Sequence, residues 1–294
     1  MGRAGFWRWR QGEPARSPVR FLRRPSLQAP VLVAAFEGWN DAGEAASTAV
    51  GALGEAWRAS ALAEIEGEEF FDFTQARPEV VIIEGETREI TWPLTGIAAA
   101  TGRNDERDVV LVSGPEPHMR WQSYTAALIG LARDLGVTRA VLLGAYLSEV
   151  THTRAVPLSG SSTDEAVLAR HNLASTRYEG PTGIVGVLGE AFGHAGIEAT
   201  TVWASVPCYS LPVSAKAALA LARATALIVE RPAILDDLEE QAVAYEQHMD
   251  ELIEEDESVA AYVARLEEME ESAVGEMSAD GLAEEIERYL RGKR

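Results

Sequence analysis

The sequence is short of several residue types on which particular kinds of site depend. Its 294 residues include one cysteine, Cys208, which excludes a disulfide framework within the chain and a zinc site built from several cysteines. It has two lysines, Lys216 and Lys293, beside 24 arginines. No run of about 18 apolar residues occurs, so we expect no transmembrane helix and no membrane partner. These absences favour a cytoplasmic protein.

The motifs of common nucleotide, metal and hydrolase sites are also missing. The sequence has no G-x-G-x-x-G, no Walker lysine loop, no H-E-x-x-H, no G-x-S-x-G and no C-x-x-C. His171, His194 and His248 lie on separate predicted helices without metal-ligand spacing. We therefore expect no metal and no cofactor. A protein without enzymatic activity is favoured, although catalysis stays open and no catalytic residue is assigned.

Basic charge is scarce overall, and the excess of acid is unevenly placed. The 26 basic and 46 acidic side chains give a net charge of -20, which argues against a nucleic-acid partner and against docking on anionic lipid. Residues 236–287 alone carry 20 acids against Arg265, a net charge of -19. Residues 1–24 carry seven arginines against Glu13, a net charge of +6. The C-terminal segment 236–287 therefore holds almost all of the excess negative charge.

Short apolar runs alternate with helical patterns through the middle of the chain. Strands are predicted at residues 31–36, 61–66, 80–84, 88–92, 109–112, 139–143 and 198–205, and helices at 42–58, 119–135, 184–195 and 213–229. Strand-like runs alternate with helical patterns along the chain, and within a run polar and apolar residues rarely alternate strictly. Together these patterns predict an α/β fold with a mostly parallel sheet flanked by helices. A polar loop is predicted over 148–162, with a helix start capped by Ser162 and Glu165 after it.

We expect three parts. These are a basic, disordered arm at residues 1–24, an α/β core domain at 25–232 and an acidic helical C-terminal subdomain at 233–294. In the last part apolar residues step by four and three from Leu238 to Leu252, the spacing of an amphipathic helix. It is predicted to pack on the core or on a sister subunit; a free coiled coil is the alternative. A last helix is predicted up to about Leu290. We predict the oligomer or partner contact at Tyr245, Met249, Leu252 and Val259.

Four polar clusters follow predicted strands, where α/β proteins commonly bind ligands. They lie at residues 37–43, 113–121, 148–154 and 178–183. As an active site they would offer a base, Asp41 or His152, and anion-binding arginines. The alternative interpretation makes Asp41 a helix cap and His152 a turn residue, with Arg120 pairing with Glu116. The candidate pocket residues are Trp39, Asn40, Asp41, Glu116, Arg120, His152, Thr153, Arg154, Tyr178 and Thr182.

Taken in order, these clusters resemble the bacterial, actinobacterial-type branch of the proteasome assembly chaperone 2 family. The residues that carry the resemblance are Phe36–Gly43, Gly114–Pro117, Arg120-Trp121, His152–Arg154, Tyr178–Gly183 and Leu282–Leu290. The resemblance implies a phosphorylase/hydrolase-like α/β fold with a C-terminal helical extension. It also implies a homo-oligomer, with a trimer as one candidate. The chain departs from the family pattern at Thr151, where proline is usual, and at Cys208, where histidine is usual.

Two functions compete at this point. The leading hypothesis is a non-enzymatic, oligomeric, assembly-chaperone-like protein that binds protein partners, with proteasome subunits as candidates. The alternative is a small-molecule-binding protein or enzyme that uses the charged strand-end pocket. An ATP-grasp or carboxylate–amine ligase activity is disfavoured, because such sites need lysines over the nucleotide phosphates and the chain has only two.

Overall fold

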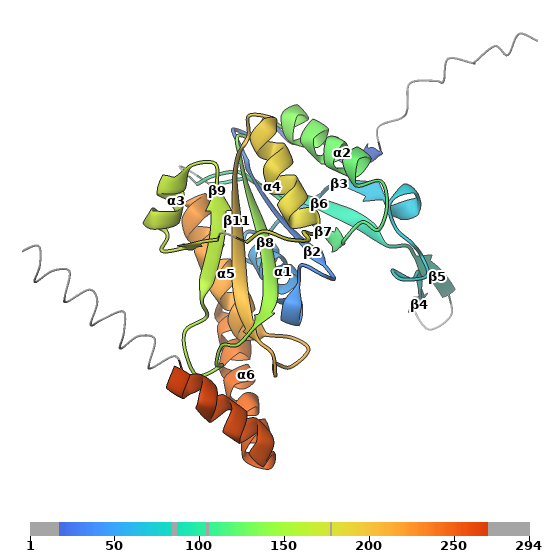
Figure 1. The fold of residues 1–294 in the computed structure, drawn as a ribbon. Coiled ribbons are helices and arrows are strands. Elements are labelled where there is room, and N and C mark those ends of the chain that lie inside the picture. The colour runs from blue at the N-terminus through green and yellow to red at the C-terminus, as the bar shows by residue number, and fades with distance from the viewer. Residues whose placement is uncertain (1–17, 84–86, 104–105, 177, 270–294) are drawn as a thin grey trace, which may run out of the picture.

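A computed structural model describes residues 18–83, 87–103, 106–176 and 178–269 of the chain. Its centre is a nine-stranded sheet in the order β1-β3-β6-β7-β2-β8-β11-β9-β10 (Figure 1). The strands are β1 Val19–Phe21, β2 Val31–Glu37, β3 Ser60–Glu66, β6 Leu94–Ala100, β7 Val109–Pro115, β8 Arg139–Ser148, β9 Leu158–Ser162, β10 Ala174–Ser175 and β11 Glu198–Pro207.

The four central strands β7, β2, β8 and β11 run parallel. On one side β6, β3 and β1 are added antiparallel, and on the other side β9 pairs antiparallel with β11. All but the last residue of β2 are buried, as expected for a strand covered on both faces. The predicted α/β fold with a large, mostly parallel sheet flanked by helices is confirmed.

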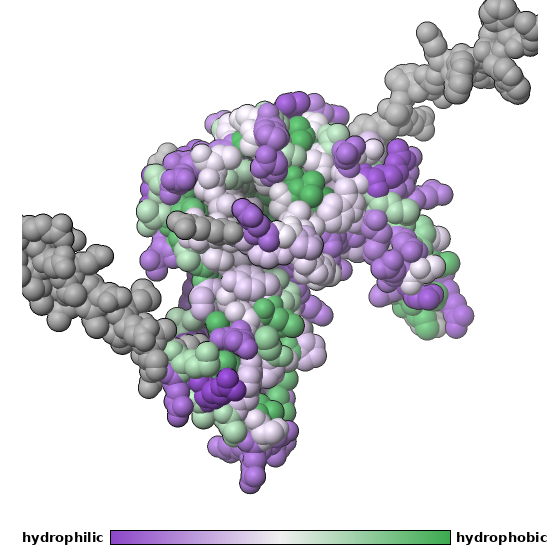
Figure 2. All heavy atoms as spheres, viewed as in Figure 1, coloured by the Kyte–Doolittle hydropathy of each residue, from purple (hydrophilic) through white to green (hydrophobic). Residues whose placement is uncertain are grey.

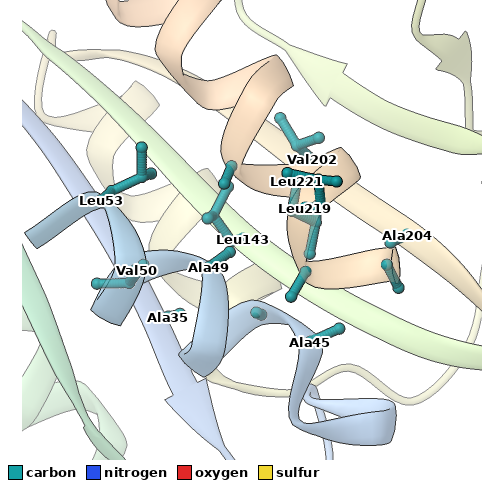
Figure 3. Packing of buried hydrophobic residues seen from close by; sticks show 14 of the residues in the cluster. Ala35, Ala45, Ala49, Val50, Leu53, Leu143, Val202, Ala204, Leu219 and Leu221 are labelled. Carbon is teal, nitrogen blue, oxygen red and sulfur yellow. The ribbon is translucent and has the colours of Figure 1, made fainter. Parts of the chain in front are cut away.

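Helices cover both faces of this sheet (Figure 1). On one face lie α1 Ala45–Ala56, α5 Ala215–Val229 and α6 Asp236–Glu255, and on the other lie α2 Trp121–Asp134 and α4 Ile184–His194. Alternate residues of β2 serve the two faces, because Val33 packs in the cluster with α1 and α5 while Ala34 packs in the cluster with α2 and α4. Figure 3 shows strand residues Ala35, Leu143 and Val202 in the first of these clusters.

Three local predictions need correction. The polar loop predicted over 148–162 contains β9, whose polar residues are held by pairing with β11. The predicted disordered arm of residues 1–24 is wrong for residues 19–21, which form β1. There Arg20 pairs with Glu64, and Val19 and Phe21 pack on the core. The short helix α3, Glu165–Arg170, is capped by the side chain of Asp164 and not by Ser162. Residues 1–17 lie outside the described residues.

The apolar stripe of α6 lies within the chain's own core. Leu238, Ala242, Tyr245 and Met249 are buried in the same cluster as α5, and Leu252 packs at its margin. Residues 257–269 are also helical, and Val259 is half-buried there. The division of the chain at residue 232 stays a prediction, and the predicted last helix near Leu290 lies outside the described residues. No helix in the described ranges is long and apolar enough to cross a membrane.

A second, two-stranded sheet stands beside the body of the molecule (Figure 1). It is a hairpin of β4 Glu79–Ile83 and β5 Thr87–Thr91, which pair antiparallel. Both strands fall where the sequence predicts strands. A single-turn helix, η2 Gly67–Glu69, precedes the segment that leads to it.

Candidate functional site

Three of the four polar clusters meet where β2 and β7 end. These strands are parallel neighbours, and Glu37 of β2 lies opposite Pro115 of β7. The following residues, Asn40 and Glu116, are therefore brought together. Glu116 Oε1 accepts a hydrogen bond from Asn40 Nδ2 at 2.6 Å and another from the backbone N–H of Ile184 at 2.7 Å.

Ile184 is the first residue of α4, so Glu116 places a carboxylate at the N-terminus of that helix. The first N–H groups of a helix lack hydrogen-bond acceptors within the helix and carry partial positive charge. A carboxylate at this end accepts a hydrogen bond from them and interacts favourably with the charge. Gly183 precedes the helix and leaves room for Asn40, because a Cβ at this glycine would overlap Asn40 Oδ1. Asn40 is fully buried, and its backbone oxygen accepts from the N–H of Ala145 at 2.7 Å.

Asp41 performs the corresponding task for α1, on the opposite face of the sheet. Its Oδ1 accepts from the backbone N–H of Ala46 at 2.6 Å, and its Oδ2 accepts from the hydroxyl of Ser47. This is the helix-cap role that the alternative interpretation of Asp41 predicts. Burial raises the pKa of Asp41 above its usual value, although the hydrogen bonds from Ser47 and Ala46 lower it in part. Asp41 and Glu116, to which the adjacent Asn40 donates, thus anchor helices on opposite faces of the sheet.

Arg120 does not pair with Glu116. Its Nη1 lies 2.6 Å from Glu69 Oε2 in an exposed ion pair at the start of α2. Each of these side chains is more than half exposed, so solvent screens the pair and its contribution to stability is small. Glu116 is instead committed to Asn40 and α4.

Trp39 lies between two clefts and lines both of them. The first, of about 900 Å³, is bounded by the ends of β2 and β7 and the base of the β4–β5 hairpin, and it is also lined by Glu37, Arg77, Glu116 and His118. Burial raises the pKa of Glu37, and the charge of Asp41 raises it further. The second cleft, of about 650 Å³, lies along α4, β9 and β11 and is lined by aromatic and hydroxyl side chains, among them Tyr146, Tyr178, Thr182, Thr201 and Trp203.

The fourth cluster lies against the C-terminal helices. His152 is buried, with its Nδ1 2.9 Å from the hydroxyl of Tyr209 and its Nε2 3.0 Å from Asp250 Oδ1 of α6. Thr153 Oγ1 donates to Glu267 Oε1 at 2.7 Å. Arg154 is exposed beside them. Neither cleft at Trp39 is lined by residues 152–154.

The candidate residues therefore form two groups. Trp39, Asn40, Glu116, Tyr178 and Thr182 surround the start of α4. His152 and Thr153, with the exposed Arg154 beside them, lie against α6 and residues 257–269. Asp41 at α1 and Arg120 beside Glu69 belong to neither group. Tyr209 and Asp250, which contact His152, are missing from the prediction because they lie 57 and 98 positions away from it. No local pattern in the sequence signals such contacts. Within the described ranges, no three His, Cys, Asp or Glu side chains are placed to hold a metal ion.

Comparisons with known proteins give a consistent result. A sequence model of the PAC2 family matches residues 35–253. A PAC2 family protein of Streptomyces avermitilis is 45% identical, with a TM-score of 0.73, over 80% of this chain and 99% of its own. A proteasome-assembly chaperone homologue of Mycobacterium tuberculosis is 44% identical, with a TM-score of 0.72, over 79% of this chain and 99% of its own.

A more distant similarity extends to the archaea. A proteasome activator of Pyrococcus furiosus is 17% identical, with a TM-score of 0.65, over 80% of this chain and 97% of its own. At that identity the similarity concerns the fold alone. A search of curated proteins gave no match.

Proposed function

The chain belongs to the PAC2 family, and on this premise we propose that it is a non-enzymatic, oligomeric, assembly-chaperone-like protein. Its partners are proteins, and proteasome subunits are the first candidates. The observation that carries the proposal is the 44% identity to a proteasome-assembly chaperone homologue over nearly all of that protein's length. The described polar clusters support it, because Asp41, Glu116 and His152 are each used in contacts within the chain.

The outward face of α6 is the surface that we propose for a partner. Its inward face is occupied by the core, where two of the four predicted contact residues, Tyr245 and Met249, are buried. The other two, Leu252 on α6 and Val259 on the following helical residues, are half-buried. Acids recur on the exposed side at helical spacing, namely Asp237, Glu240, Glu251 and Glu254. A face of this charge attracts a basic partner surface and raises the rate of encounter.

Binding to purified subunits tests the proposal. The full chain is mixed with recombinant α-type and β-type proteasome subunits of the source organism, and complexes are measured by native mass spectrometry and by the rate of 20S particle formation. The variant E251K/E254K reverses charge near the end of α6, where cations suit the helix dipole and the fold is preserved. We expect its association rate to fall on the order of tenfold.

The control is the reversal of an exposed acid at the end of another helix, Asp134→Lys on α2, which should bind like the wild type. If no subunit of either type forms a complex with the wild-type chain, the chaperone proposal fails. If E251K/E254K binds as fast as the control variant, the partner surface does not lie on α6.

A second candidate function is small-molecule binding in the cleft beside Glu116. It is favoured by the cleft's volume of about 900 Å³ and by the opposite charges of Arg77 and Glu37 in its wall. A thermal-shift screen with nucleosides, nucleotides, phosphate and carboxylates tests it. Arg77→Ala should abolish a shift produced by an anion, whereas Arg133→Ala, which removes an exposed arginine on α2, should not. A shift that both variants retain places the ligand elsewhere.

A further inference from the structure

A cleft of about 560 Å³ lies at the edge of the sheet opposite the candidate site. Its lining includes Ser60 of β3 and Ala99 of β6, which pair with each other beside the start of the parallel strand β7. Its described lining residues carry one carboxylate, of Glu106, and four guanidinium groups, of Arg23, Arg58, Arg103 and Arg231. Positive charge is therefore concentrated here in a chain whose net charge is -20.

The surface at the far end of α6 has the opposite charge. Figure 2 shows hydrophilic residues around the lower tip of the molecule, which is where α6 ends in Figure 1. Residues 254–257 at this tip are four exposed acids. The cleft lies instead beside the start of α6, because Pro232, Ala233 and Ile234 line it. An anion is therefore repelled from the tip and attracted to the cleft.

Arg231 places a buried positive charge in the wall of this cleft. Its side chain is only 5% exposed, and the nearest carboxylate oxygen among the described residues, Glu106 Oε2, lies 3.9 Å from its Nη2. Its guanidinium donates to three backbone oxygens, those of Ala100, Thr101 and Arg107, at 2.9–3.3 Å. The Nε–H is buried and has no acceptor among the described residues. Uncharged carbonyls satisfy part of this group, but they do not neutralise its charge.

Arg58 occupies a backbone position at which glycine is usual. The helix α1 ends in a Schellman motif, in which the N–H of Ala59 donates to the oxygen of Gly54 at 2.8 Å and the N–H of Arg58 donates to that of Glu55 at 3.0 Å. Arg58 has a φ of 53°, in the left-handed region that glycine adopts without strain. A side chain there costs about 1–2 kcal/mol. Local stability therefore favours glycine, and an arginine at this position indicates a use for its side chain.

Helix ends account for only part of the positive charge. Both α1 and α5 end at this cleft, and each helix C-terminus carries a negative charge of about half a unit. The two helix ends and Glu106 together offset about two of the four arginine charges, which leaves about two positive charges. The side chains of Arg58 and Arg103 are exposed, and neither forms an ion pair with another residue in the described ranges. Both can therefore contact an anion.

We propose that this cleft binds a phosphate-bearing small molecule. Arg58 and Arg103 contact the phosphate, because the fork of N–H groups on a guanidinium matches two phosphate oxygens. Arg231 supplies fixed positive charge from the wall. Leu27 and Ile234 in the same lining contact the apolar part of the molecule. The cleft has the volume of a small-molecule site, and it is separate from the cleft beside Glu116.

Calorimetric titration of the full chain with inorganic pyrophosphate, at constant ionic strength, tests this site. The wild type should bind pyrophosphate. Arg58→Gly removes one guanidinium and also relieves the left-handed backbone, so the variant should melt at the wild-type temperature or above it. We expect it to bind pyrophosphate about tenfold more weakly or worse, because a charge-assisted hydrogen bond is lost. Arg103→Ala, at an exposed side chain, should weaken binding to a similar degree.

Two arginines outside this cleft provide matched controls. Arg77→Ala, in the wall of the cleft beside Glu116, and Arg133→Ala, on α2, each remove one positive charge and should bind pyrophosphate like the wild type. The proposal is overturned if the wild type does not bind pyrophosphate, or if Arg58→Gly and Arg103→Ala bind it as tightly as the controls do. A loss confined to Arg77→Ala assigns the anion to the other cleft and also overturns it. None of these outcomes depends on the binding of proteasome subunits.

Discussion

Glu116 should contribute to stability through the two hydrogen bonds that its Oε1 accepts. Glu116→Ala leaves the backbone N–H of Ile184 and the side-chain amide of Asn40 without acceptors, and both residues are fully buried. A hydrogen bond to a charged group is worth about 1.5–3 kcal/mol. The contributions of two hydrogen bonds to one atom are coupled, so the free energy lost with both is less than the sum of the two single values. We expect the free energy of unfolding to fall by about 3–4 kcal/mol.

Urea unfolding followed by circular dichroism measures this loss. Glu116→Gln keeps an acceptor oxygen and removes the charge, so we expect it to lose about 1–2 kcal/mol. Arg120→Ala breaks only the exposed pair with Glu69 and should lose less than about 1 kcal/mol. If Glu116→Ala unfolds within about 0.5 kcal/mol of the wild type, which is the usual range for neutral surface changes, the capping role of Glu116 is refuted.

Two further predictions concern Asp41 and His152. Burial raises the pKa of Asp41 above its usual 3.8, so the folded state takes up a proton at higher pH than the unfolded chain does. Stability contributed at this site therefore falls as pH rises from about 4 through the raised pKa. Relative to Asp41→Asn, the wild type should gain stability between pH 7 and pH 4; a difference that is constant with pH would contradict this. His152→Ala should lose about 2–3 kcal/mol and speed hydrogen exchange in α6, because Tyr209 and Asp250 lose their buried partner. The control Asp250→Asn changes a mostly exposed side chain and should lose less than about 1 kcal/mol. If the His152→Ala variant shows unchanged hydrogen exchange in α6, the contact between His152 and Asp250 does not hold the helix.

Much of the fold could be predicted from local patterns. The apolar run at 31–36 predicts β2, and the alanine- and leucine-rich stretch at 213–229 predicts α5, because strands and helices that are buried on one or more faces need such residues. The strand β9 could not be predicted in this way. Its sequence Leu-Ser-Gly-Ser-Ser is polar, and its position depends on pairing with β11 about 40 residues later in the chain.

The candidate site could be predicted only in part for a related reason. Clusters that follow parallel strands converge at one edge of a sheet, so the proximity of Asn40 and Glu116 follows from the predicted topology. The partner of each side chain does not follow from it. Glu116 meets Ile184, 68 positions away, and Arg120 meets Glu69, 51 positions away. Such choices depend on the path of the intervening loops, which local composition does not specify.

The sequence by itself determined the α/β class, the helical and strand periods, the concentration of acid after residue 235 and the family resemblance. These properties are local or additive, and each is carried by the order and kind of neighbouring residues. Only the tertiary structure decided that Glu116 anchors α4, that His152 joins the core to α6 and that the β4–β5 hairpin stands exposed. Those contacts join residues far apart in the chain, and they exist only after the sheet has brought the ends of its strands together.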